Sequence, residues 1–183
     1  MAKKLIEDGV LNEEDADIIE YGLDCMVNNL TGIGVTFIIV SVFESFWEAF
    51  LLCFMLFPLR KCAGGFHADT RGKCFLFSTG LLLASCILFF KLKWLDFGYL
   101  IVVSVFGGII WNLSPVENEN KQLDEMEYSV YKKRTRMILL AESLLFIICF
   151  ILECIKIQQM ITMSLFIVGI VGVTGKLKTV WRQ

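Results

Sequence analysis

Six long runs of apolar residues constrain the fold of this chain more than any other feature. They cover residues 23–43, 46–59, 75–90, 94–113, 137–152 and 157–175. A membrane-spanning helix needs about 20 apolar residues, and the fourth and sixth runs meet that length. Hydrophobic residues make up 56% of the sequence, above the roughly 45–50% usual in soluble domains. The sequence therefore predicts an all-α fold, a polytopic helical bundle in one integral membrane domain spanning residues 1–183.

The other runs are shorter or carry charges, so they are compatible with two span counts. Lysines follow the third run and can extend it, because a lysine stem reaches the interface with its ammonium group. The second run contains Glu48 and Pro58, and the fifth contains Glu142. We predict six hydrophobic segments, with four full spans and a short hairpin at 30–59 as the alternative. We expect neither acid to be catalytic.

The first 22 residues are acidic and lack the apolar core of a cleavable signal peptide. We expect this segment to lie in the cytosol as one or two amphipathic helices. Asn12 is a plausible N-cap, because acidic residues that favour a helix start begin at Glu13. The apolar side chains of the segment are compatible with contact to the membrane interface or the bundle. They are equally compatible with a solvated helix docked on the protein itself.

The distribution of lysine and arginine predicts the orientation of the chain. Of the 17 basic residues, 14 fall in residues 1–22, 60–74, 114–136 and 176–183. Basic residues concentrate in cytosolic segments of membrane proteins. We therefore expect a multi-pass protein of the cell membrane, with both termini and residues 60–74 on the cytosolic side.

Residues 60–74, RKCAGGFHADTRGKC, form a polar break that contains the only histidine, His67. Five of the seven cysteines lie in apolar runs, where a thiol acts as a small hydrophobe. Cys62 and Cys74 lie in the break, on the reducing side, where no disulfide is needed. The paired spacings of a zinc site are absent. We expect no metal or other cofactor.

A thiolate beside an imidazole is a strong nucleophile, and His67 precedes Cys74 by seven residues. On one straight helix these residues would be separated by about 10 Å along the axis, too far for proton transfer. The three glycines of the break allow a bend, and Asp69 or Thr70 can cap a new helix. Cys74 would then lie in the first turns of that helix, where the helix dipole favours the thiolate.

Two alternatives to this pair remain open. Cys62 is a rival nucleophile, five residues before His67, although its position lacks the predicted helix start. A single histidine among basic residues is also common as an ordinary polar loop residue. Spacing alone does not separate these readings.

Two motifs resemble the accessory gene regulator B (AgrB) family. The first is RKCAGGFHA at residues 60–68, followed by Cys74. The second is SPVENENK at residues 114–121. Gln122 departs from the pattern, because many relatives have proline there, and we do not expect it to affect the chemistry. Length and hydropathy also fit, so the resemblance covers nearly the whole chain.

The resemblance implies a membrane-embedded cysteine endopeptidase with Cys74 as nucleophile and His67 as the proton-transfer group. Such an enzyme cuts the acidic C-terminal tail from a short quorum-sensing peptide precursor. The resulting thioester is passed to a cysteine or serine of the same peptide, which gives a thiolactone or lactone autoinducer. The resemblance also implies a homodimer. The other expected partner is the lipid bilayer, and nucleic acid is not an expected partner.

Further residues are candidates for substrate binding or for support of the site. Basic side chains could bind the acidic tail, although positive-inside topology alone also explains them, whereas Gly64 and Gly65 would shape the bend. A neighbouring acid or amide side chain could also orient His67 and fix which ring nitrogen carries the proton. The basic candidates are Arg60, Lys61, Arg71 and Lys73, and the orienting candidates are Asp69, Glu117, Asn118 and Asn120.

Functions of other classes compete with this interpretation. A transporter or non-enzymatic scaffold subunit is one, but a transporter usually shows internal repeats and broken helices near the bilayer midplane. The polar signal here gathers in one break. A thiol acyltransferase acting on lipid would share the chemistry of Cys74 and His67, and only its substrate would differ.

Overall fold

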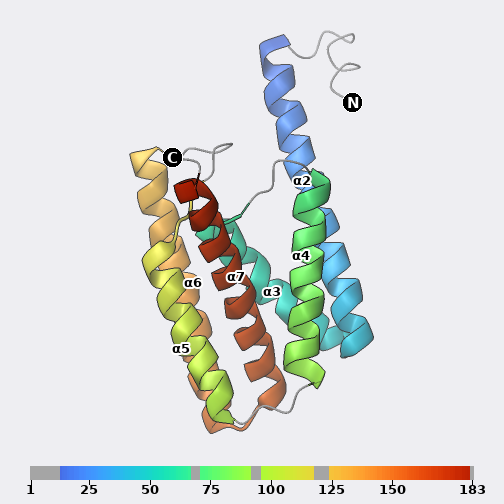
Figure 1. Cartoon of the computed structure of the whole chain (residues 1–183), viewed down its shortest axis with the longest axis vertical. Coiled ribbons are helices and arrows are strands. Elements are labelled where there is room, and N and C mark those ends of the chain that lie inside the picture. The colour runs from blue at the N-terminus through green and yellow to red at the C-terminus, as the bar shows by residue number, and fades with distance from the viewer. Residues whose placement is uncertain (1–12, 67–70, 92–95, 118–123, 182–183) are drawn as a thin grey trace. The chain divides into compact units, whose positions relative to one another are not determined.

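The computed structural model describes residues 13–66, 71–91, 96–117 and 124–181, and these ranges are almost entirely helical. Six α-helices and one short π-helical segment, η1, occur in them (Figure 1). Their bounds are α2 (Glu13–Phe43), α3 (Phe46–Ala63), α4 (Arg71–Cys86), η1 (Ile87–Lys91), α5 (Asp96–Leu113), α6 (Glu125–Ile151) and α7 (Ile155–Trp181). Each predicted hydrophobic segment overlaps one or two of these elements, so the all-α membrane bundle is confirmed.

Within the described ranges, three helices are long and apolar enough to cross a membrane, over Met26–Phe43, Gly72–Lys91 and Ile155–Trp181. A shorter apolar helix covers Phe97–Leu113. The chain is therefore a multi-pass membrane protein. The N-terminal segment differs in one respect from the expectation, because α2 continues without a break from Glu13 into the first apolar run. The proposed cap Asn12 lies outside the described residues.

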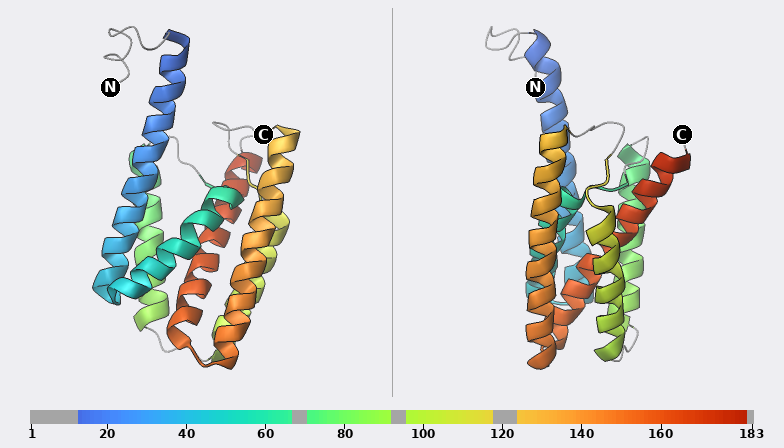
Figure 2. Two further views of the ribbon diagram at one scale, coloured as in Figure 1. Left: turned by 180° about the vertical axis from the view of Figure 1, so that it is seen from behind. Right: turned by 90° about the vertical axis from the view of Figure 1, so that its left-hand side faces the viewer.

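The chain divides into two compact units, residues 1–35 and 36–183. Within the second unit α7 is the central helix, and it packs against α3, α4, α5 and α6. Met160–Leu165 of α7 are all buried. Figure 2 shows α5, α6 and α7 alongside one another, with α3 crossing them obliquely. Gly169 permits one of these contacts, because a Cβ there would collide with the Phe106 ring of α5.

Polar contacts tie the helices together at the end of the unit where α3 begins. Lys156, at the start of α7, forms an ion pair with Glu44. Gln159 donates hydrogen bonds to the Phe89 carbonyl, at 3.4 Å, and to the Tyr99 hydroxyl, at 3.0 Å. The opposite end of α3 carries the polar break. Side-chain contacts thus join the helices at the end where α3 begins, and the candidate site lies at the opposite end.

Candidate active site

The Gly64–Gly65 pair ends α3 and turns the chain away from the helix axis. Gly64 has φ = 71° and Gly65 has φ = 137°, a region that residues with a Cβ rarely adopt. The Gly64 N–H caps the helix by donating to the Arg60 carbonyl at 3.2 Å. A new helix, α4, begins at Arg71. The predicted break between two helices is confirmed.

The break is fastened to two segments that lie far from it in the sequence. The Val116 N–H donates to the Ala63 carbonyl at 2.9 Å, and Gly64 pairs with Val116 in an isolated parallel β-bridge. The Phe66 N–H donates to the Val171 carbonyl of α7 at 3.0 Å. The second motif of the sequence therefore packs directly on the first.

Glycine is required where these backbones meet. A Cβ on Gly64 would overlap the Val116 carbonyl oxygen, and one on Gly65 would lie 2.6 Å from the Val171 side chain. A Cβ on Gly175 of α7 would lie 2.7 Å from the Gly65 carbonyl carbon. Real Cβ atoms essentially never approach this closely, so the three glycines together set the path of the chain.

Cys74 lies in the first turn of α4 and is partly buried. The backbone N–H groups of a first helical turn lack partners within the helix, and the helix dipole is positive at that end. Lys73 is exposed beside it. Cys74 is thus the fourth residue of α4, and its role as the nucleophile stays a prediction.

Arg60, in the last turn of α3, faces the helix that carries Cys74. It lies beyond the apolar run 46–59, and its Nη2 donates to the Ser78 hydroxyl of α4 at 3.3 Å. Burial lowers the pKa of the Arg60 guanidinium, and the neighbouring Cys74 thiolate raises it. The Arg60 guanidinium therefore interacts electrostatically with Cys74, which precedes Ser78 by one turn of α4.

Cys62, the rival nucleophile, has different surroundings. It is buried near the end of α3. Burial raises the pKa of its thiol, and Arg134 and Lys61 oppose this effect only in part. A raised pKa keeps the thiol protonated and weakly nucleophilic near neutral pH. These surroundings favour Cys74 as the reactive thiol.

Phe66 anchors the chain immediately before His67. Its ring centroid lies 4.9 Å from that of Phe77 in α4, and the Lys178 Nζ of α7 lies 5.5 Å from the same centroid. With its N–H bonded to α7 as well, Phe66 is held by contacts with both α4 and α7. Among the predicted supporting residues, Lys61 and Glu117 are exposed. His67, Asp69, Asn118, Asn120 and the side chain of Arg71 lie outside the described residues.

A family model for accessory gene regulator B matches residues 1–174. This chain belongs to the AgrB family. The resemblance seen in the two motifs is therefore confirmed.

Two relatives of this AgrB-family chain come from Clostridium perfringens. A putative AgrB-like protein of strain SM101 is 31% identical in an alignment of 148 positions that covers 73% of this chain and 66% of the relative. A putative AgrB-like protein 2 of strain 13 is 29% identical over 146 residues, covering 75% and 65%. The matched region thus spans slightly less than two thirds of either relative. No solved structure matches the chain.

Sequence patterns do not identify several residues of the candidate site. Ser78 and Lys178 lie in ordinary helical surroundings, and their sequence context carries no signal of a site. Gly175 carries a weaker signal, since small residues mark close packing of helices, but the sequence does not show that it packs on the glycine pair of the break. Only the three-dimensional path of α7 connects it to residues 64–66.

Proposed function

We propose that this protein is a membrane cysteine endopeptidase that processes a short quorum-sensing peptide precursor. The observation that carries the proposal is the position of Cys74 at a helix start beside the Arg60 guanidinium. An N-terminal dipole and a nearby cation both stabilise a thiolate. Membership of the AgrB family supports the same chemistry.

In the proposed reaction, the Cys74 sulfur attacks a backbone carbonyl carbon of the precursor. A carbon–sulfur bond forms, the peptide carbon–nitrogen bond breaks, and His67 delivers a proton to the departing amine. The acidic C-terminal tail leaves, and a peptide–enzyme thioester remains. Backbone N–H groups near Cys74 at the start of α4 are the proposed donors to the oxyanion.

The second step transfers the acyl group to a cysteine or serine side chain of the same peptide. The new thioester or ester closes a thiolactone or lactone ring, and the Cys74 thiolate is regenerated. Exchange between two thioesters changes the bond energy little, whereas hydrolysis would release the linear peptide. A site at the membrane boundary favours ring closure because it limits water.

Exposed basic residues around the break are proposed to bind the acidic tail. Lys61 at the end of α3 and Lys73 at the start of α4 both present their charges to solvent. Lys178 adds a third cation over Phe66. We further propose that this end faces the cytosol, where the precursor is made, and that the enzyme works as a homodimer.

The decisive experiment co-expresses the chain with a precursor peptide and follows both by intact mass. We expect a thioester adduct on the wild-type chain that is absent in Cys74→Ala and retained in Cys62→Ala. A fatty acyl adduct on Cys74 would instead indicate an acyltransferase acting on lipid. Full cleavage by Cys74→Ala would contradict the proposal, provided that both variants insert in the membrane.

A further inference from the structure

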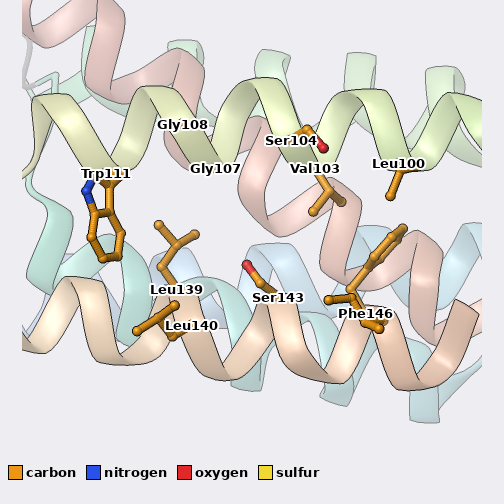
Figure 3. A pocket seen from close by; sticks show the side chains of 11 residues that line it. Leu100, Val103, Ser104, Gly107, Gly108, Trp111, Leu139, Leu140, Ser143 and Phe146 are labelled. Atoms are coloured by element: carbon orange, nitrogen blue, oxygen red, sulfur yellow. The ribbon is translucent and has the colours of Figure 1, made fainter.

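A groove between α5 and α6 lies outside the candidate active site. Its volume is about 360 Å³, within the range of small-ligand sites. Figure 3 shows Trp111 at one end of the groove and Phe146 toward the other, with Ser104 and Ser143 between them. Leu140 and Ile147 on its rim are more than half exposed. The groove therefore opens to the outside of the bundle.

Two glycines give the groove its depth without serving the packing of the chain. A Cβ on Gly108 would meet nothing within 4 Å, and one on Gly107 would only touch Leu139, at 4.0 Å. Glycine disfavours a helix interior relative to alanine. Unlike Gly169 and Gly175, neither residue is required by a neighbouring helix, so the space that they leave is available to a ligand.

A cation marks the Trp111 end of this apolar groove. The Arg136 guanidinium lies over the Trp111 ring, 4.6 Å from its centroid. Its buried Nε has no hydrogen-bond partner within the described part of the chain. Lys132 and Lys133 precede it by one turn of α6. The ligand that complements this arrangement has an apolar chain and an anionic group at one end.

We infer that the groove binds an anionic glycerophospholipid, with an acyl chain between α5 and α6 and the phosphate at Arg136. The cation at one end of an otherwise largely apolar groove complements the phosphate and the acyl chain of such a lipid. Coverage of the groove by a helix of a second copy or of another protein is the alternative that the experiment below distinguishes. An acyl chain is thin enough to enter.

The headgroup would lie at the same end of the bundle as the glycine break. From Trp111 the chain runs through Ser114–Val116 to its backbone contact with Gly64. A bound lipid would therefore hold α5 and α6 where they support residues 64–66. This inference concerns lipid binding alone and does not require that the chain cleave a peptide.

Bromine quenching of Trp111 fluorescence tests the site directly. The full-length chain, with its other three tryptophans replaced by phenylalanine, is reconstituted in vesicles of fixed phosphatidylcholine and phosphatidylglycerol content. Bromine is carried on the acyl chains of one lipid or the other. We expect brominated phosphatidylglycerol to quench about fivefold more strongly at equal mole fraction, the scale of one basic residue near an anionic lipid.

Three variants distinguish lipid bound in the groove from lipid in general contact with the protein. Arg136→Gln should remove the preference for phosphatidylglycerol, and Gly108→Leu should fill the groove and reduce quenching by both lipids. Gly80→Leu on α4 is the matched control, because a side chain there also enters open space. Equal quenching by the two lipids in the unaltered groove would overturn the inference. Quenching by neither would overturn it as well, since another chain would then cover Trp111.

Discussion

At Arg60, a single side chain of α3 interacts electrostatically with a thiol on α4. The guanidinium bonds to Ser78 and interacts with Cys74. In the sequence, Arg60 is one of the basic candidates for binding the acidic tail. Its position within the bundle, in contact with α4, favours a role in holding Cys74 as a thiolate.

Replacing Arg60 tests this role. We expect Arg60→Gln to lower precursor cleavage near neutral pH by about tenfold or more, the scale of one nearby opposite charge. Less thiolate is then present at any given pH, so the acid limb of the pH–rate profile should move to higher pH. Arg60→Lys should restore part of the activity. The exposed neighbour provides the control, since Lys61→Gln should leave the acid limb in place, and an unshifted limb in Arg60→Gln would refute the role.

The second residue-scale prediction concerns His67. Its replacement by alanine should cost roughly 10²–10⁴ in cleavage rate, the usual scale for a positioned acid–base group. Because it is the only histidine of the chain, diethylpyrocarbonate should inactivate the wild-type enzyme through this one residue. Undiminished turnover by His67→Ala would leave the reaction without its proton-transfer group.

At the scale of the elements, the site depends on how closely α3, α7 and the segment after α5 approach one another. These contacts join backbone to backbone, through Val116 and Val171. Side-chain substitutions that preserve the backbone path should be tolerated there. Substitutions that add atoms at the glycines should not, even in a helix that carries none of the reacting groups.

Gly175 and Gly172 of α7 form a matched pair for this prediction. A Cβ at Gly175 would collide with the backbone of Gly65, whereas one at Gly172 would meet nothing within 4 Å. We therefore expect Gly175→Ala to reduce both precursor cleavage and thermal stability in detergent. Gly172→Ala should leave cleavage unchanged and raise stability by up to about 1 kcal/mol, the helix preference of alanine over glycine. Equal behaviour of the two variants would contradict the packing described for the break.

Sequence patterns were sufficient for some elements of the fold and not for others. The six helices follow from hydropathy, because each apolar run must satisfy its own backbone hydrogen bonds in a membrane. The break follows from Gly64 and Gly65, since few other residues adopt their φ values. The contacts of Gly65 with Gly175 and of Arg60 with Ser78 join helices distant in sequence. They depend on packing geometry, which periodicity within one helix does not encode.

At the scale of the whole molecule, the proposed function requires that the break face the cytosol. Cys74 lies near one end of the helical bundle, and Cys154 lies in the turn between α6 and α7 at the other. In chains that retain only one of these cysteines, labelling of the thiol shows on which side of the membrane that end of the bundle lies. The bias of lysine and arginine toward residues 60–74 and 114–136 predicts which side is which.

A membrane-impermeant maleimide measures this orientation. We expect the chain with Cys74 alone to be labelled in inverted vesicles and not in intact cells. The chain with Cys154 alone should show the reverse pattern, which controls for access and expression. Labelling of Cys74 from outside the cell would exclude the proposed function, because the precursor is synthesised in the cytosol.

The hydrogen bond from Phe66 to Val171 also bears on the order in which the chain is synthesised and folds. Residue 66 leaves the ribosome long before residue 171, so a nascent chain carries both motif residues without the helix that secures them. Until α7 has been made and inserted, the Phe66 N–H cannot bond to the Val171 carbonyl. Gly65 likewise lacks its contact with Gly175. The proposed protease would therefore stay inactive until α7 enters the membrane.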